Sequence, residues 1–235
     1  MKDNTAALTF CPTLMQMMES RQVQLPNGEH LNIRGTSTIN NISAIRRLLQ
    51  KDKPTSTLEI GLAFGASALT ILATQRELRE PGSFEHVAID PYQAEAWKSA
   101  GLHSIHSAKL ADGFTHIPED SALALPSLVQ HNKSFGLIYI DGSHIFENVF
   151  IDFFYCTRML EMNGVVLFDD CTDKNVRKVL GFIDHNYSEI LARENVVAEP
   201  TAKQRIGHAL GFQQLTAYRK IGEPPRKWNS PFRNF

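Results

Sequence analysis

The sequence lacks the cysteine pattern that a disulfide framework or a structural zinc site requires. Its three cysteines, Cys11, Cys156 and Cys171, are widely spaced, and no CxxC pair or cysteine–histidine cluster occurs. It also lacks an excess of either charge, because 24 Lys and Arg face 25 Asp and Glu, a formal net charge of -1. Nucleic acids and anionic membranes attract strongly basic proteins, so this balance disfavours both as partners.

Long hydrophobic runs are absent as well. No stretch of about 18 apolar residues that could span a membrane occurs, and the N-terminus has no continuous apolar segment of the secretory kind. We therefore expect a cytoplasmic protein. With 43% hydrophobic and 21% charged residues, the composition is that of a globular protein, and 235 residues fit one α/β domain.

Apolar strands alternate with amphipathic helices along most of the chain. This pattern predicts a doubly wound, mostly parallel, Rossmann-like α/β fold of seven strands, with helices on both faces and an antiparallel C-terminal strand. The expected strands are 57–61, 86–90, 102–106, 135–140 and 164–168, with two weaker ones between 191 and 218. The expected helices are 66–77, 92–99, 118–129 with a break at Pro126, 146–160 and 173–187.

Three segments describe the domain organisation. Residues 1–50 are expected to form a helical preface of the same domain, with Ile42, Ile45 and Leu49 on one helical face. Residues 51–221 are expected to form the main domain, where Gly207 and Gly211 blur the last strands. Residues 222–235 contain three prolines and are expected to run extended. The aromatic side chains of this tail suggest docking onto a surface or a partner subunit, and a loosely ordered terminus is the alternative: Trp228, Phe232 and Phe235.

The first strand ends in a turn suited to a ligand. Gly61 and Gly65 permit a tight turn and close approach of a ligand to the backbone amides at a helix start. A dinucleotide site would place glycine where Ala63 and Ala66 stand. Glu59 precedes this turn and would repel a pyrophosphate, but it suits a cofactor that carries a cationic amino group. This charge argument favours S-adenosylmethionine over NAD, and a purely structural turn is the alternative.

Acidic residues also close the later strands. Asp90 ends the second strand, where a carboxylate can accept hydrogen bonds from both ribose hydroxyls of either cofactor. Asp141, Asp169 and Asp170 end two further strands. Because parallel strands end at the same edge of a sheet, we expect these three carboxylates to converge.

In combination, these motifs resemble the class I S-adenosylmethionine-dependent methyltransferases, in particular the small-molecule O-methyltransferase-like group of methyltransferase family 24. The resemblance extends over about residues 56–187, and the segment that begins at Asp141 is its most specific part. The motifs occur in family order: Glu59-x-Gly61-x-x-x-Gly65-x-Ser67, Ile89-Asp90-Pro91, Ile140-Asp141-Gly142-Ser143-His144-x-x-Glu147 and Phe168-Asp169-Asp170.

The resemblance implies roles for individual residues. Glu59, Gly61 and Ser67 would hold the methionine end of the cofactor, and Ala63, Gly65 and Asp141 are further cofactor-binding candidates. Asp90 would hold the ribose, with Pro91 and Tyr92 beside it, and Asp120 and Ser121 would border the adenine. Two positions depart from the family pattern: Leu123 replaces an acid and Phe146 replaces a tyrosine.

The acidic residues also predict a metal. An oxygen-rich set made of Asp141, Asp169 and Asp170 suits Mg²⁺ or another hard divalent cation. The resemblance supports this, since metal-dependent O-methyltransferases place two acids and an amide at similar strand ends. The alternative is that Asp169 and Asp170 cap the following helix and bond His144.

His144, beside Asp141, is the candidate general base, since imidazole titrates near neutral pH. The alternative is that His144 orients Asp141 or caps a helix. Cys171 is interpreted as a packing residue, because methyl transfer is a direct displacement that needs no covalent intermediate.

The sequence therefore predicts an enzyme that transfers a methyl group from S-adenosylmethionine to a hydroxyl of a small molecule, with divalent-metal assistance as an option and His144 and Asp141 as catalytic residues. The alternatives are an NAD-type or other nucleotide-binding oxidoreductase on the same fold, or a non-catalytic cofactor-binding protein. We also expect a homodimer, because the tail is aromatic and because similar enzymes commonly form dimers.

Overall fold

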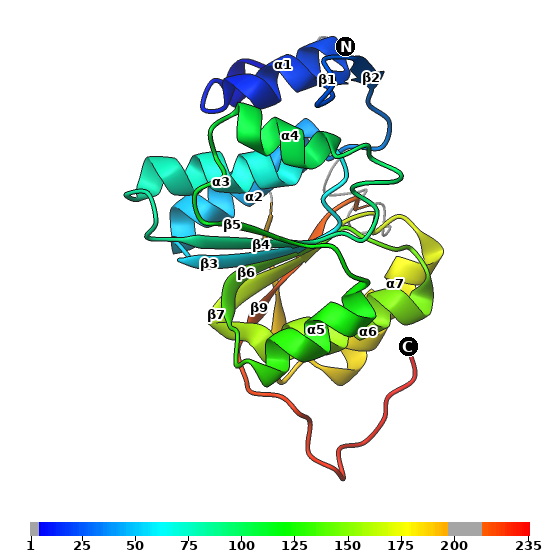
Figure 1. Ribbon diagram of the computed structural model, residues 1–235. Coiled ribbons are helices and arrows are strands. Elements are labelled where there is room, and N and C mark those ends of the chain that lie inside the picture. Colours follow the sequence, from blue (N-terminus) through cyan, green and yellow to red (C-terminus); the bar gives the residue numbers. More distant parts are fainter. Residues whose placement is uncertain (1–4, 197–212) are drawn as a thin grey trace. The chain divides into compact units, whose positions relative to one another are not determined.

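The computed structural model describes residues 5–196 and 213–235. Its main sheet has seven strands in the order β5-β4-β3-β6-β7-β9-β8 (Figure 1). The doubly wound, Rossmann-like α/β fold predicted from the sequence is confirmed. The chain divides into two compact units, 1–120 and 121–235.

The first unit contains the predicted helical segment and the strands of the glycine turn. Its sheet strands are parallel, with Glu59 of β3 opposite Ala88 of β4. Helix α3 is buried along most of its length, from Ala66 to Gln75. The elements are η1 (Thr5–Leu8), α1 (Pro12–Ser20), β1 (Gln22–Gln24), β2 (His30–Asn32), α2 (Ile39–Asp52), β3 (Ser56–Ile60), α3 (Ala66–Leu78), β4 (Glu85–Ile89), α4 (Ala100–Ser107) and β5 (Phe114–Ile117).

Three predictions for this unit need correction. The strand expected at 102–106 lies within α4, whose buried residues include Ala100, Ser104 and Ile105 at helical spacing. The third strand is instead β5, an edge strand. The helix expected at 92–99 is a series of turns, and positive φ angles at Lys98 (50°) and Ser99 (57°) separate it from α4. The preface also contains an antiparallel hairpin, β1–β2, besides its helices.

The second unit carries the strands that end in aspartates. Strand β6 pairs in parallel with β7, and β9 runs antiparallel to both β7 and β8. The break expected at Pro126 does not occur, since Pro126 lies inside α5. Proline at the sixth helical position removes only one backbone donor. The elements are α5 (Ser121–Gln130), β6 (Phe135–Ile140), α6 (Phe146–Met159), β7 (Leu160–Phe168), α7 (Lys174–Asn186), β8 (Leu191–Glu194) and β9 (Thr216–Lys220).

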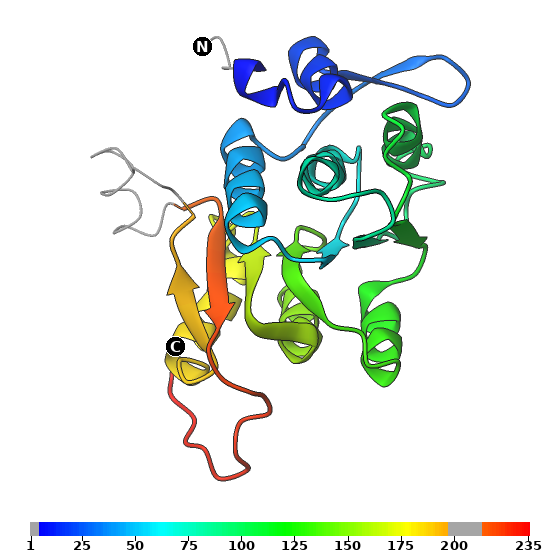
Figure 2. The same ribbon diagram turned by 90° about the vertical axis from the view of Figure 1, so that its left-hand side faces the viewer.

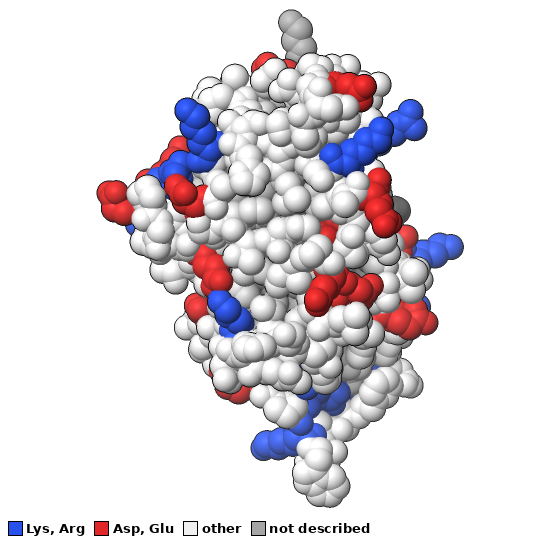
Figure 3. Space-filling model, viewed as in Figure 1, with Lys and Arg blue, Asp and Glu red and all other residues white. Residues whose placement is uncertain are grey.

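The last two strands agree with the two weaker strands predicted between 191 and 218. Gly207 and Gly211, which were expected to blur them, lie outside the described residues. The helices that the structure describes include none long and apolar enough to cross a membrane. On the face drawn in Figure 3, Lys and Arg side chains are scattered among Asp and Glu.

The C-terminal tail returns to the second unit and contacts α7 (Figure 2). The rings of Phe232 and Phe235 lie 6.2 and 5.3 Å from the ring of Phe182. Asn186 donates to the carbonyl of Arg233 and accepts from its amide, both at 2.8 Å. Phe232 and Phe235 therefore dock onto a surface of their own unit, one of the alternatives that the aromatic tail suggests, whereas Trp228 is 97% exposed.

We expect Asn186→Ala to destabilise the second unit by about 2 kcal/mol, because each of the two hydrogen bonds contributes roughly 1 kcal/mol. The tail should also become more accessible to proteases. Thermal unfolding and limited proteolysis measure both effects. Gln130→Ala on the exposed side of α5 is the control and should change neither.

Candidate functional site

The turn after β3 is held in shape by Asp90 at the end of β4. One carboxylate oxygen of Asp90, Oδ2, accepts hydrogen bonds from the amides of Leu62 (3.1 Å) and Ala63 (2.9 Å). The other, Oδ1, accepts from the amide of Tyr92 at 2.8 Å. Asp90 is buried, so these bonds form in a poorly solvated place where they are strong. The predicted ribose-binding acid thus also organises the glycine turn.

The backbone of this turn adopts left-handed conformations. Gly61 and Gly65 have φ angles of 93° and 85°, and Ala63 between them has a φ of 45°. Glycine adopts such angles without strain, which explains two of the three positions. The amide of Gly65 donates to the carbonyl of Leu62 at 2.7 Å. The turn leads directly into α3, at whose start Ser67 is buried.

Two residues that the sequence analysis did not single out complete this turn. The side-chain amide of Gln93 donates to the carbonyl of Ala63 (2.8 Å) and to Asp90 Oδ2 (3.0 Å). Gly101 of α4 packs so closely that a Cβ there would lie 2.5 Å from the carbonyl oxygen of Ala63. In the sequence, Gln93 was marked only by its proximity to Asp90, and Gly101 only by being a glycine inside an apolar stretch.

Glu59 is placed differently from its neighbours on the turn. Its side chain is fully buried, and neither carboxylate oxygen has a hydrogen-bond partner among the described residues. Its Oε1 lies 3.5 Å from Nε2 of His86, whose Nδ1 is 3.0 Å from the hydroxyl of Thr57. The adjacent parallel strands β3 and β4 bring these side chains together.

The remaining residues predicted to contact the cofactor lie in turns of the first unit and at the start of a helix of the second. Tyr92 is 57% exposed and offers an accessible ring. Pro91 begins the series of turns after β4, and Asp120 is exposed at the end of the first unit. Ser121 begins α5 of the second unit.

In the second unit, the three predicted aspartates converge as expected. The hydroxyl of Tyr139 donates to Asp141 Oδ2 at 3.1 Å and also to Asp169 Oδ2. Asp169 Oδ1 accepts from the amide of Asp170 at 2.7 Å. Tyr139 was missed because it lies inside an apolar strand, although its position two residues before Asp141 places both side chains on one face.

Gln214, just before β9, joins the cluster from a distant part of the chain. Its side-chain amide donates to Asp169 Oδ1 at 3.1 Å and to Asp170 Oδ1 at 2.5 Å. Burial raises the pKa of Asp169, and hydrogen bonds from Tyr139 and Asp170 partly oppose that rise. The donors around Asp169 thus stabilise a carboxylate that burial alone would disfavour.

His144 forms an accessible pair with Asp170. Its Nε2 lies 2.8 Å from Asp170 Oδ2, and the two side chains are 46% and 36% exposed. Asn175 Nδ2 donates to the backbone carbonyl of His144 at 2.9 Å. The helix α7 is capped by Asp173, not by Asp169 or Asp170. The predicted bond between the aspartate pair and His144 is therefore present, through Asp170.

Burial makes the thiol of Cys171 chemically unreactive. It raises the pKa of the Cys171 thiol to about 12, and it also raises the pKa of Cys11 and Cys156. A thiol with so high a pKa holds almost no thiolate at neutral pH, and the thiolate is the nucleophile.

We therefore expect the folded protein to resist alkylation by iodoacetamide at pH 8, and Cys171→Ala to retain methyltransferase activity. Mass spectrometry of the alkylated protein measures the first effect. Unfolding in urea supplies the control, since all three cysteines should then react. Rapid labelling of native Cys171 would contradict the packing role.

Comparisons with known proteins agree with this geometry. Residues 58–171 match the model of methyltransferase family 24, described as a methyltransferase domain. The match spans both the glycine turn and the aspartate cluster. No curated protein sequence matches the chain.

Solved structures share the fold at low sequence identity. An O-methyltransferase from Bacillus cereus in complex with SAH is 16% identical, with a TM-score of 0.65 over 94% of this chain and 96% of that one. The SAH-bound methyltransferase PaMTH1 from Podospora anserina is 16% identical, with a TM-score of 0.63 over 90% and 88%. The O-methyltransferase TomG from Streptomyces achromogenes, in complex with SAM, is 15% identical, with a TM-score of 0.60 over 94% and 92%.

The family match and the shared fold confirm the resemblance that the motifs carry and do not favour the oxidoreductase alternative. Residues 58–171 of the chain match a methyltransferase domain, and the described residues have the fold of the S-adenosylmethionine-dependent class I methyltransferases.

Proposed function

We propose that the protein methylates a hydroxyl group of a small molecule and that His144 removes the hydroxyl proton. The observation that carries this proposal is the accessible pair of His144 and Asp170, which lies within the matched part of the chain. The names of the similar structures, which are O-methyltransferases with SAH or SAM bound, support oxygen as the methylated atom.

S-adenosylmethionine supplies the methyl group when it is bound. We assign its binding to the turn of Gly61, Ala63 and Gly65, which the carboxylate of Asp90 holds in shape. The further residues that we assign to this site are Glu59, Ser67, Pro91, Tyr92, Asp120, Ser121 and Asp141. The carboxyl group of Glu59 is buried beside the turn, so Glu59 would act on the cofactor from beneath the turn and not from an exposed position.

The two nitrogens of His144 have different roles. Nε2 is engaged by Asp170, which fixes the ring and stabilises the imidazolium that forms after proton transfer. Nδ1 is then the nitrogen that accepts the proton of the acceptor hydroxyl. As the oxygen loses its proton it becomes a stronger nucleophile towards the methyl carbon, and positioning of the two reactants supplies much of the remaining rate.

The aspartates do not fit the divalent cation that the sequence suggests. Every carboxylate oxygen of Asp169 and Asp170 faces a protein donor, from Tyr139, Gln214, His144 or the amide of Asp170. A cation would have to displace these donors before it could reach the oxygens. Within the residues that the structure describes, no group of three or more His, Cys, Asp or Glu is arranged as a metal site.

We therefore expect the methylation rate to be unchanged by EDTA and by added Mg²⁺. Gln214→Ala should lower the rate instead, because Asp170 would lose a donor that helps to position it for His144. Initial rates in EDTA, in Mg²⁺ and in the variant measure this directly. If EDTA abolishes the rate and Mg²⁺ restores it, the conclusion that protein donors exclude a cation is wrong, and a metal at Asp141, Asp169 and Asp170 is supported.

Transfer of a labelled methyl group from S-adenosylmethionine tests the function itself. Catechols, phenols and aliphatic alcohols form the acceptor panel, with matched amines and thiols as controls. Labelled ethers are the expected products, and products only from amines or thiols would contradict O-methylation.

The charge balance leads us to expect no nucleic-acid or membrane partner. The homodimer predicted from the tail is tested by sedimentation.

A further inference from the structure

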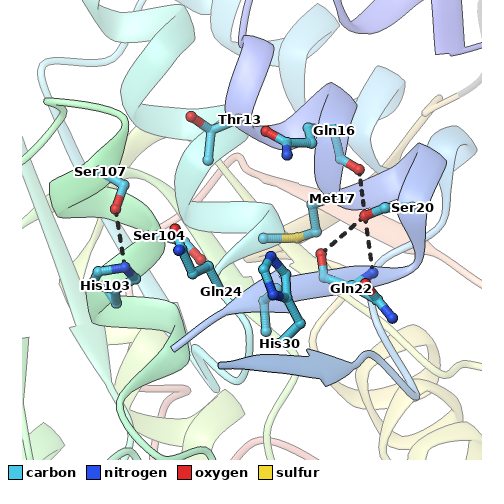
Figure 4. Close-up of a pocket in the computed structure, with 11 residues that line it drawn as sticks. Thr13, Gln16, Met17, Ser20, Gln22, Gln24, His30, His103, Ser104 and Ser107 are labelled. Atoms are coloured by element: carbon cyan, nitrogen blue, oxygen red, sulfur yellow. Dashed lines mark hydrogen bonds between the residues drawn. The ribbon is translucent and has the colours of Figure 1, made fainter. Parts of the chain in front are cut away.

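The first unit contains a polar pocket that the methyl-transfer proposal does not use. It lies between α1, the β1–β2 hairpin and α4, and its volume is about 330 Å³ (Figure 4). Small-molecule sites commonly measure about 300–1,000 Å³, so the pocket has room for a small ligand. All its lining residues lie between positions 13 and 107, within one compact unit.

The lining of this pocket is polar but carries no carboxylate, ammonium or guanidinium group. Nine of its eleven lining residues are Gln, Ser, Thr or His, and the other two are Met17 and Val23. Among the described residues that line it, none is Asp, Glu, Lys or Arg. A charged ligand would lose hydration there without a carboxylate, ammonium or guanidinium group to pair with, which is costly.

The polar side chains of the lining are suited to pair with the hydroxyl groups of a ligand. Amide, hydroxyl and neutral imidazole side chains each offer both a donor and an acceptor. The hydroxyl groups of a ligand do the same, so each can be paired in both directions. An apolar ligand would instead leave these groups unpaired, at a cost in binding free energy.

Several lining groups retain unused hydrogen-bonding capacity. The side chains of Thr13, Gln16, Gln24 and His30 form no hydrogen bond with another residue of the lining (Figure 4). Others stiffen the wall: Ser104 donates to the carbonyl of Ala100 at 2.8 Å. The unused groups come from α1, β1 and β2, so the pocket presents donors and acceptors from separate elements (Figure 4).

One wall of the pocket, helix α4, also supports the glycine turn. Ser104 lines the pocket one turn of α4 beyond Gly101, which packs against the carbonyl of Ala63. A ligand in the pocket would thus contact the helix that holds the turn. We infer that this pocket binds a neutral, hydroxyl-rich molecule of sugar size, either free or as the glycosyl part of a larger compound.

The test is a titration of the full chain, followed by NMR chemical shifts and by ligand-observed saturation transfer. The probes are D-glucose and myo-inositol as neutral polyols, phenyl glucoside as a glycosyl compound, glucose 6-phosphate and glucuronate as charged analogues, and cyclohexanol as an apolar one. We expect the neutral polyols to bind at least about tenfold more tightly than the charged and apolar probes, since only they match the lining without uncompensated desolvation.

Variants locate the binding. Gln16→Leu and Gln24→Leu alter exposed positions and should abolish it without affecting folding. Gln130→Leu on α5 is the matched control and should leave it unchanged. Equal affinity for glucose and phenyl glucoside identifies a free sugar, and tighter binding of the glucoside identifies a glycosyl group. The inference is overturned if no polyol binds, if the charged analogues bind equally well, or if the two pocket variants bind as the control does.

Discussion

Replacing His144 with alanine is expected to lower kcat by about 10²–10⁴-fold, the range typical for the loss of a general base. The imidazole is accessible and is held by Asp170 at 2.8 Å, so its removal leaves the acceptor hydroxyl without a positioned proton acceptor. Binding of the cofactor should be unaffected, because the glycine turn does not involve His144. Steady-state rates and S-adenosylhomocysteine affinity, measured on the same preparation, separate the two effects.

Two further variants make this prediction specific. Asp170→Asn should lower kcat by a smaller factor, because it retains a hydrogen-bond partner for the imidazole but loses the charge. Added imidazole should partly restore the rate of His144→Ala and have no effect on Asp170→Asn. His185→Ala is the control, since His185 is exposed on α7 and its Nδ1 lies 2.8 Å from the carbonyl oxygen of Gly181 in its own helix. An unchanged kcat in His144→Ala would rule out the general-base role.

The second large effect is expected from Gly101→Ala. A Cβ at this position would lie 2.5 Å from the carbonyl oxygen of Ala63 and 3.1 Å from the side chain of Leu62. Alanine favours helices by about 1 kcal/mol over glycine, but here the clash is with backbone and therefore dominates. Overpacking of this kind costs about 1–3 kcal/mol. If the clash is relieved by displacement of the turn, the same free energy is lost from cofactor binding, and S-adenosylhomocysteine affinity should drop by about 5- to 150-fold.

Gly181→Ala provides the matched comparison. Gly181 lies in the interior of α7, and a Cβ there would be 3.6 Å from the nearest atom, the ring of Phe235. The same substitution should therefore leave cofactor affinity unchanged and should maintain or raise thermal stability. Calorimetric titration and thermal unfolding of both variants test the pair. Equal cofactor affinity in Gly101→Ala and the parent protein would show that α4 does not support the turn.

The sequence was sufficient to predict those elements in which burial and periodicity agree. Strand β6 is a continuous apolar run because it is buried throughout, and α7 has a clear apolar face. The prediction failed at 102–106, where Leu102 and Ile105 stand three residues apart, a helical spacing that is hard to recognise in so short a segment. It also missed β5, since an edge strand with partly exposed side chains has little hydrophobic signal.

The candidate site was predictable to the extent that it follows strand ends. Asp90, Asp141, Asp169 and Asp170 could be identified because parallel strands deliver their last residues to one edge. Gln214 could not, since it lies 44 residues beyond Asp170 in the chain and reaches the cluster only through the pairing of β9 with β7. The consequence is chemical, because Gln214 and Tyr139 donate to the carboxylate oxygens of Asp169 and Asp170 that a metal would use.

Calorimetric titration with S-adenosylhomocysteine, with NADH as the control ligand, tests whether the protein binds the methyl-donor cofactor. We expect saturable binding of S-adenosylhomocysteine with and without Mg²⁺, and no binding of NADH. Binding of NADH without binding of S-adenosylhomocysteine would contradict it.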